Sequence, residues 1–452
     1  MPLTRTEAAF DALSALSDAL RVPASERSYG RQFAQMYDYR LAVLRRRVLQ
    51  QSEEPAFQAQ YGPAQYVERL LDMPPRTLCL VIGTFYCAMQ NKPDVLQEMA
   101  RDFSLPAPPL ATSYVGEQDE LFLEDQSGRV RLVGELVRPG SALARQCVTG
   151  AVAGVLGYET PEGDLNVHHL FFPGPPPPVS MPAAPTPGSI VLASGLLAGD
   201  DAHPERDMAL ELLLEWLTGE LVAPAAQAAQ ARISSLVIAG NAVGRTAWAP
   251  ADRQSAHSHP FAALDPWLDQ VCATLDAVVL QPGATDPCST ALPQQPLLAP
   301  LVPRASRWPS LHRVTNPSWF ALHHRTFLST SGQTLHDLLK YLPDEEQAEH
   351  RLLLALATLR WAHVAPTAPD TLWCYPFQAT DPFLLRAAPD VYVVGNQPAF
   401  ATATLKAPHA NGTHTVRIIL VPEFASTQQV VVLDAETLEA RPLSFRTCHT
   451  HN

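Results

Sequence analysis

The 452-residue chain predicts a mixed α/β protein with two folded parts, a small β-barrel followed by an α/β layered domain. Before residue 173, short apolar runs are separated by turn residues, which is typical of short strands. After residue 189, fully apolar runs alternate with helical patterns, and a proline-rich segment separates the two parts. Because 46% of the residues are hydrophobic, the chain can bury a substantial core, and its length favours two or three domains.

Residues 1–50 are predicted to be a helical region. Between residues 6 and 20 an apolar side chain recurs every three or four positions, at Phe10, Leu13, Leu16 and Leu20. This spacing predicts an amphipathic helix, and a second helix is expected over residues 31–49 after a break at Pro23. We expect the apolar stripe to pack on the neighbouring barrel, although such a stripe could also dock a partner.

Residues 51–172 are predicted to form the barrel. Residues 78–89 form one expected strand, and residues 121–137 and 147–172 form two expected hairpins with glycine-containing turns. Five such strands with a helix at residues 94–102 suit a closed barrel of the oligonucleotide/oligosaccharide-binding (OB) type. Periodicity alone does not separate this barrel from a small sandwich.

The barrel strands carry aromatic residues that could stack nucleic-acid bases: Phe85, Tyr86, Phe122, Tyr158, Phe171 and Phe172. OB barrels bind single strands with aromatics set in a basic groove, and few Lys or Arg accompany these residues. The formal net charge of −13 also repels phosphate backbones. Core packing is therefore the favoured interpretation, with the barrel as a protein-docking surface, and protein partners with basic surfaces are expected.

The segment at residues 173–189 is a predicted linker. It contains eight prolines, which cannot continue a helix or a sheet ladder and which favour an extended conformation. Residues 190–446 then alternate apolar strand-length runs (190–196, 233–239, 277–280, 391–394) with helical stretches (207–221, 264–276, 345–359). Further strands are expected at 325–329, 416–421 and 430–433, and residues 447–452 are a tail. The alternation predicts an α/β layered domain whose strands are covered on both faces.

Four of these strands run into glycine- or proline-containing turns at residues 194–199, 240–244, 282–287 and 395–398. Their order resembles the metallophosphoesterase signature SDxHxG, GDxxD, PGNHD and GHxH, whose side chains hold two divalent ions. The corresponding ligand positions are Gly195, Leu197, Asn241, Gly244, Ala284, Thr285, Asn396 and Pro398. Gly, Leu, Ala and Pro side chains have no lone pairs to donate. The sequence therefore predicts no catalytic residue, no metal site and no cofactor.

Other candidate groups have weaker support. Three close pairs of histidines are candidates for a metal site: His257 and His259, His323 and His324, and His449 and His451. No pair has the ligand count that a metal requires, so surface or packing roles are expected. Asp286 is expected to cap the turn at Pro287, and Ser331 is expected to cap a helix, since no GxSxG turn surrounds it. Seven scattered cysteines without a CxxC pair indicate reduced thiols.

Long strings in the second half resemble the small, or B, subunits of replicative DNA polymerases, and within these the subunits of polymerase delta. They are LPQQPL (292–297), VTNP (314–317), FLSTSGQ (327–333), PTAPDTLWCYPF (366–377), TDPF (380–383), GNQPAF (395–400) and VPEFASTQ (421–428). Looser matches at residues 27–33, 37–41 and 190–199 extend the resemblance over nearly the whole chain.

This resemblance implies an OB domain beside a calcineurin-like phosphoesterase domain whose active site has decayed. It also implies a nuclear, non-catalytic scaffold that bridges the cysteine-rich carboxy-terminal region of the catalytic subunit and a third accessory subunit. DNA would be contacted only through the complex, and no apolar run is long enough for a membrane span. Two alternatives remain open: a metal-dependent phosphodiesterase or 3′ to 5′ nuclease, and a single-strand DNA-binding OB protein.

Overall fold

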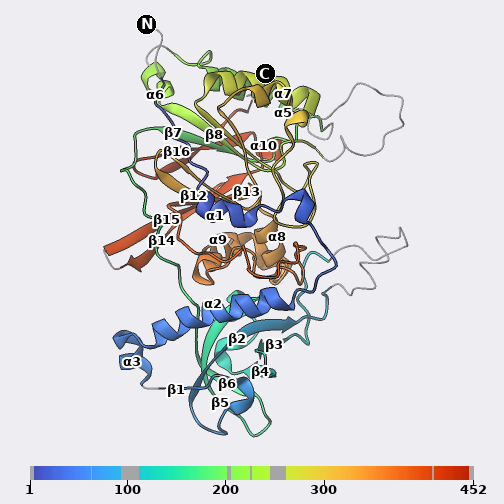
Figure 1. The fold of residues 1–452 in the computed structure, drawn as a ribbon, viewed down its shortest axis with the longest axis vertical. Helices are drawn as coiled ribbons and strands as arrows, with labels where there is room; N and C mark the ends of the chain where they lie inside the picture. Colours follow the sequence, from blue (N-terminus) through green and yellow to red (C-terminus); the bar gives the residue numbers. More distant parts are fainter. Residues whose placement is uncertain are drawn as a thin grey trace, which may run out of the picture. The chain divides into compact units, whose positions relative to one another are not determined.

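The computed structural model describes residues 5–62, 64–92, 111–200, 205–223, 226–244, 261–409 and 412–446 (Figure 1). The chain divides into two compact units, which we describe separately. The first unit comprises Met1–Arg27, Pro177–Gln333 and Ala387–Asn452, and the second comprises Ser28–Pro176 and Thr334–Arg386. The predicted domain boundaries stay predictions, and the predicted tail, the helix at 94–102 and the pairs His257/His259 and His449/His451 lie outside the described residues.

The second unit contains the expected barrel. Its strands are β1 (Gln65–Tyr66), β2 (Cys79–Ala88), β3 (Glu120–Glu124), β4 (Arg129–Val133), β5 (Val152–Glu159) and β6 (Leu165–Phe171). They are ordered β1-β2-β3-β4-β6-β5, and an additional pairing between β2 and β5 closes the sheet on itself. This closure decides between the two sequence-based alternatives in favour of a barrel.

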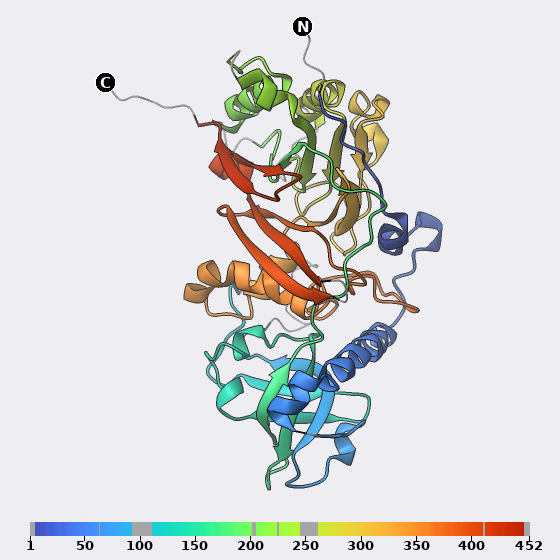
Figure 2. The ribbon, with the colours of Figure 1, turned by 90° about the vertical axis from the view of Figure 1, so that its left-hand side faces the viewer.

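The predicted second helix is confirmed as α2 (Ala34–Ser52), which lies across β2 and β5 in both views (Figures 1 and 2). Its buried apolar side chains lie on one face, at Met36, Leu41, Leu44 and Val48. A short helix, α3 (Pro55–Tyr61), follows it. The unit also contains α9 (Asp344–Arg360) and most of α8 (Gln333–Leu339).

A buried arginine on α2 ties distant segments of the second unit together. Arg40 is fully buried, and its Nε donates to Oδ2 of Asp381 at 2.8 Å. Its Nη atoms donate to the carbonyl oxygens of Gly150 (3.1 Å), Pro366 (2.8 Å) and Ala368 (2.7 Å). A buried charge is tolerated only when it is paired and hydrogen-bonded. Arg40 therefore requires the loop at Gly150 and the loop at Pro366 and Ala368 to stay against α2.

His363 completes this cluster as a neutral ring. Its Nε2 donates to the same Oδ2 of Asp381 at 2.8 Å, and its Nδ1 accepts the backbone N–H of Ala365 at 3.2 Å. An accepting Nδ1 carries no proton, so the ring is the uncharged Nε2–H tautomer. Burial and the charge of Arg40 agree with this state, since they lower the pKa of His363 to about 4.

The first unit contains two sheets. The first sheet has the order β10 (Leu311–Arg313), β9 (Ala277–Gln281), β8 (Ile233–Ala239), β7 (Ser189–Ala193), β16 (Gln429–Asp434) and β17 (Ala440–Ser444). The second has the order β11 (Ser318–Leu322), β12 (Arg325–Thr330), β13 (Val391–Gln397), β15 (Gly412–Pro422) and β14 (Ala401–His409). The predicted strands are confirmed, whereas the four edge strands β10, β11, β14 and β17 were not predicted, although β11 carries the apolar run Trp319–Leu322.

Successive side chains of the central strands point to opposite faces of the first sheet. Because both faces are covered, these side chains build two cores. Val191 and Ala193 pack with α5 (Glu205–Thr218) and α7 (Phe261–Thr274), which cover the first sheet. Ile190 and Leu192 point the other way and pack with the second sheet. Helices, first sheet and second sheet therefore form successive layers of this unit (Figure 1). Two short helices, α6 (Gln227–Ala231) and α10 (Phe424–Thr427), complete it.

The predicted amphipathic helix at residues 6–20 is wrong. Only α1 (Ser14–Ser17) and one 3₁₀ turn (Asp18–Leu20) are helical. Upstream, Asp11 exchanges two backbone hydrogen bonds with Ala321 of the edge strand β11, at 3.0 and 2.7 Å, and Phe10 stacks on His312. The edge strand offers unpaired backbone groups, and pairing with them overrides a weak helical spacing.

The predicted linker forms neither a helix nor a sheet ladder. Its residues 173–188, all described, contain no helix and only an isolated bridge between Pro178 and Ala388. Among the described residues, no helix is long and apolar enough to cross a membrane.

Replacing Arg40 by Ala is expected to lower the free energy of unfolding by about 3–5 kcal/mol, because Asp381 loses its buried charged partner. Arg46→Ala is the matched control, since Arg46 lies exposed on the same helix and its loss should change stability by less than about 0.5 kcal/mol. Urea unfolding of the two variants measures the difference. Equal stabilities would show that the cluster does not hold the unit together.

Candidate functional site

The turns that follow β7 and β8 lie side by side at the carboxyl ends of these parallel strands. The backbone N–H of Gly195 donates to the carbonyl oxygen of Gly240 at 2.9 Å, and that of Leu197 donates to Asn241 at 3.1 Å. Gly244 returns a bond to Ala198 at 3.1 Å. The first two predicted motifs, at residues 194–199 and 240–244, are thus joined by backbone hydrogen bonds. This is expected because β7 and β8 are adjacent parallel strands, whose carboxyl ends lie at the same edge of the sheet.

The turn after β9 is joined to the turn after β8 through side chains. Oδ1 of Asn241 accepts the backbone N–H of Thr285 at 3.1 Å, and Oγ1 of Thr285 donates to the carbonyl oxygen of Val243 at 2.6 Å. Asn241 has a φ of 55°, a left-handed conformation that Asn tolerates better than most residues. Its side chain is therefore directed at the chain itself. Ala284, the remaining ligand position of this turn, is exposed.

Asp286 is buried, with 6% of its surface exposed, and it bridges the same two turns. Its Oδ1 accepts the backbone N–H of Val243 at 3.0 Å, and its Oδ2 accepts that of Gly283 at 2.8 Å. These bonds differ from the expected cap at Pro287, because the carboxylate reaches back to Gly283 and across to the neighbouring turn. Burial raises the pKa of Asp286 to about 6, although the backbone donors oppose this rise.

The fourth motif brings in the second sheet, and it forms the irregular end of β13 rather than a turn after it, because the pairing register with β15 shifts between Val394 and Gln397. The backbone N–H of Asn396 donates to Oγ of Ser194 at 2.8 Å. Its Nδ2 donates to the carbonyl oxygens of Ser331 (2.8 Å) and Ala239 (3.3 Å). Pro398 is exposed at the end of this motif. Asn396 therefore links the ends of strands from both sheets.

The space between these turns is filled by the chain. A Cβ atom added to Gly195 would lie 2.5 Å from Cγ of Glu423 and 2.7 Å from Oδ1 of Asn396. A Cβ added to Gly244 would lie 2.3 Å from Cβ of Asp200. Real Cβ contacts do not approach so closely, so no larger side chain fits at either position without a shift of its neighbours.

The eight predicted positions are thus brought together, and they offer little to a metal ion. Five have no side-chain donor atom: Gly195, Leu197, Gly244, Ala284 and Pro398. Asn241, Thr285 and Asn396 direct their polar groups to backbone atoms. In the described part of the chain, no group of three or more His, Cys, Asp or Glu is arranged to hold a metal.

Sequence reasoning named Ser331 as a helix cap but missed the amide side chains that surround it. Oγ of Ser331 accepts Nδ2 of Asn316 at 2.8 Å, and the same Nδ2 contacts Oε1 of Gln294 and of Gln333 at 2.8 Å. Ser331 thus lies in an amide cluster just before α8. All four residues lie in the sequence strings that resemble polymerase B subunits, at 292–297, 314–317 and 327–333. Those strings were the one signal that could have indicated these residues, but they do not show which residues contact one another.

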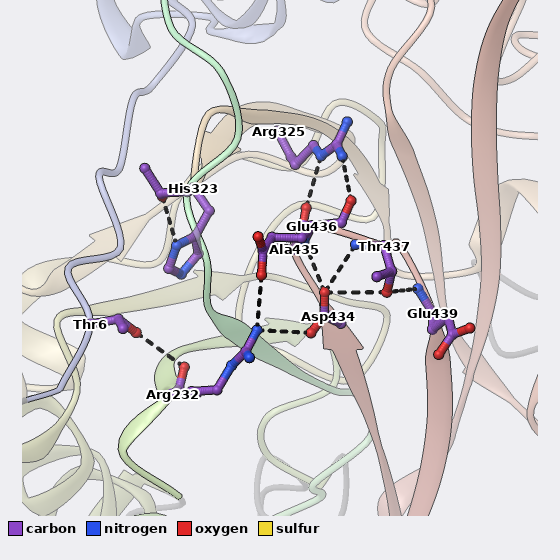
Figure 3. A network of polar contacts seen from close by, with 10 residues as sticks. Thr6, Arg232, His323, Arg325, Asp434, Ala435, Glu436, Thr437 and Glu439 are labelled. Atoms are coloured by element: carbon purple, nitrogen blue, oxygen red, sulfur yellow. Dashed lines mark hydrogen bonds and ion pairs between the residues drawn. The ribbon is translucent and has the colours of Figure 1, made fainter. Parts of the chain in front are cut away.

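At the opposite ends of the strands, charged residues hold the turn between β16 and β17 (Figure 3). Nη2 of Arg232, just before β8, contacts Asp434 at 3.1 Å and Glu436 at 3.2 Å. Arg325 donates to the carbonyl oxygens of Ala435 (2.9 Å) and Glu436 (2.8 Å). Arg232 thus pairs with two carboxylates and Arg325 bonds two backbone carbonyl groups, so the contacts brace the turn between β16 and β17.

His323, seen beside this network in Figure 3, is fully buried. It is one of the paired histidines for which a surface or packing role was expected. Its ring nitrogens contact Oγ of Ser234 at 2.8 Å and Oγ1 of Thr186 at 3.1 Å, and burial lowers its pKa. The ring therefore packs between β8 and the end of the linker. This is the packing role expected for it.

Two of the barrel aromatics, Phe85 and Tyr86, are engaged in packing contacts, whereas Tyr158 is exposed. Phe85 is 1% exposed and contacts Phe172 edge-on. Tyr86 is covered by the guanidinium of Arg129, whose carbon lies 4.2 Å from the ring centroid, and Arg129 is paired with Glu124. The nearby cation is therefore neutralised by a carboxylate, which disfavours contact with phosphates.

Comparisons with known proteins agree with this architecture. Residues 190–402 match the family model for the B subunits of DNA polymerases alpha and epsilon, and residues 32–170 match the DNA polymerase delta subunit OB-fold domain. The chain is 34% identical to the DNA polymerase delta small subunit of Saccharomyces cerevisiae, covering 98% of this chain and 95% of that one. It is 35% identical to the Arabidopsis thaliana DNA polymerase delta small subunit, covering 92% of each. The DNA polymerase II small subunit of Pyrococcus horikoshii is 22% identical over 63% of this chain and 46% of its own length.

Introducing an acidic side chain at the first motif by Gly195→Asp should destabilise the protein by about 1–3 kcal/mol beyond a matched control, because the new side chain overlaps Glu423 and Asn396. The control is Gly163→Asp, since Gly163 also has a positive φ but has no atom within 4 Å of an added Cβ. Thermal or urea unfolding gives both values. A Gly195→Asp variant no less stable than the control would show that the site has room for a ligand.

The raised pKa of Asp286 predicts a defined pH dependence. Since the folded pKa of about 6 exceeds the ordinary value of 3.8, Asp286 contributes most stability below pH 3.8 and loses it as the pH rises through 6. Relative to Asp286→Asn, which does not titrate, the wild-type unfolding free energy should fall by about 3 kcal/mol over this window. Urea unfolding at a series of pH values measures the difference. A constant difference would contradict the burial argument.

Proposed function

Because the chain belongs to the family of DNA polymerase delta small subunits, which are accessory subunits of a replicative polymerase, we propose that it acts as a non-catalytic scaffold within that complex. The scaffold joins the cysteine-rich carboxy-terminal region of the catalytic subunit to a third accessory subunit. Any metal cluster of the complex belongs to the catalytic partner.

One observation carries the proposal: the convergent turns of the first unit use their polar groups on the chain itself. Asn241, Asp286 and Asn396 bind backbone atoms, and Gly195 adjoins Glu423 with no space for a ligand. On this proposal the first unit is a calcineurin-like phosphoesterase domain whose metal site has become a structural junction. The hydrogen bonds that replace the ligands support it, since they connect both sheets without an ion.

The composition and surface of the chain support a role in protein assembly. A stable interface buries about 1,600 Å² in total, so two partners would need a large share of a rigid surface. The net charge of −13 disfavours autonomous binding to DNA, which the scaffold would contact only through the complex. The six cysteines in the described residues are free thiols, which suits the reducing nucleus, where we place the protein.

Reconstitution tests the bridging role. A tagged catalytic-subunit fragment should retain the third accessory subunit only when this chain is present, because the two have no other link on this proposal. The matched control is the same fragment without its cysteine-rich end, which should retain neither protein. Size-exclusion chromatography of the eluate then reports a ternary complex. Retention of the third subunit without this chain would refute the bridge.

A further inference from the structure

One short stretch of the first unit exposes apolar and basic side chains together. Leu298 is 68% exposed and Trp308 is 40% exposed, and the informative feature is that both occur in one short stretch, since singly exposed apolar side chains are common. Exposed prolines and arginines accompany them. We call this set the Trp308 surface, and its members are Leu298, Pro300, Pro303, Arg304, Arg307 and Trp308.

The backbone folds these residues into a compact double turn. Two 3₁₀ turns, Ala299–Leu301 and Ala305–Arg307, follow one another. Ser306 joins them, since its N–H donates to the carbonyl oxygen of Val302 at 2.9 Å and its hydroxyl donates to Ala299 at 3.3 Å. The contact brings the end that carries Leu298 to the turn that carries the two arginines.

Acidic residues of α7 hold this double turn in place from beneath. Asp265, which is buried, accepts the backbone N–H groups of Arg304 at 3.1 Å and Ala305 at 3.0 Å. Asp269 accepts Nε1–H of Trp308 at 2.7 Å. This hydrogen bond orients the indole before any partner arrives, which reduces the conformational entropy lost when it is covered.

The surface is also locally basic in an acidic protein. Within the described residues, neither Arg304 nor Arg307 forms an ion pair, and the one side-chain bond of the pair runs from Nε of Arg307 to the carbonyl oxygen of Arg304 at 3.4 Å. Asp265 is directed at backbone groups and Asp269 at the indole. The guanidinium groups thus keep most of their donors for an external acceptor.

We propose that the Trp308 surface binds an acidic protein segment that carries a bulky apolar side chain. Trp and Arg dominate the energetics of protein interfaces, with the aromatic ring as anchor and the arginines selecting carboxylates. A nucleic acid fits less well, because a single aromatic beside the carboxylate of Asp269 provides no stacking platform and no basic groove. The inference rests on the proposed scaffold role for the expectation of a partner, and it specifies that partner's chemistry at one surface.

Selection from random peptides tests this proposal while the partner is still unidentified. The full chain is immobilised, phage-displayed short peptides are selected on it, and binders to the Arg304→Glu/Arg307→Glu variant are removed. This variant keeps the backbone bonds to Asp265, so its fold is preserved. The enriched peptides should be net acidic and contain Leu, Phe or Trp.

Fluorescence anisotropy of an enriched peptide gives the quantitative readout. Affinity should fall by about tenfold or more in Trp308→Ala and in the double arginine variant, and it should weaken as salt rises. Matched controls are Trp373→Ala and Arg138→Glu, whose side chains are exposed in the second unit and should not affect binding. Circular dichroism confirms that each variant is folded.

Three results would overturn the proposal: no peptide that distinguishes the wild type from the double variant, enrichment of neutral or basic peptides, or unchanged affinity in Trp308→Ala. An oligothymidylate that binds and is lost in the same variants would assign the surface to nucleic acid instead. The selection contains no polymerase subunit, so its failure is distinct from a failure of the reconstituted bridge.

Discussion

The junction at the carboxyl ends of the strands depends on the requirement that buried polar groups be satisfied. Four turns bring backbone N–H and C=O groups into a space that excludes most water, and each unpaired group there would cost about 1–3 kcal/mol. Asp286 satisfies donors of two turns, Asn241 satisfies a third donor, and Asn396 connects both sheets. With these bonds in place, the two sheets are fixed relative to each other within the first unit.

The second unit follows the same rule with a charged group. Arg40 can stay buried because Asp381 and three carbonyl oxygens surround it, and neutral His363 completes the shell of Asp381. Each unit therefore has a buried polar centre built from segments that are distant in sequence. Such centres favour one arrangement of the chain, which suits a protein proposed to present fixed surfaces to other subunits.

The Trp308 surface, proposed for a partner, differs from these buried centres. The Trp308 surface is the exposed side of a short double turn whose other side, at Val302 and Ala305, packs in the core, and α7 holds the turn through Asp265 and Asp269. Exposed large apolar groups are costly to solubility unless a partner covers them. A rigid interior with a few such surfaces is the expected physical form of a scaffold, in contrast to an enzyme, whose buried polar groups must stay available to a substrate.

The sequence by itself determined the barrel strands, the alternating strands and helices of the first unit, helix α2 and the absence of donor side chains at five motif positions, because hydrophobic periodicity and residue chemistry are local properties. It did not determine the path of residues 6–13, the roles of Asp286 and Arg40, or the grouping of residues 334–386 with the barrel. The tertiary structure decided these, since each depends on unpaired backbone groups or charges supplied by segments far away in the chain. Local spacing carries no information about which distant carbonyl or N–H will need a partner.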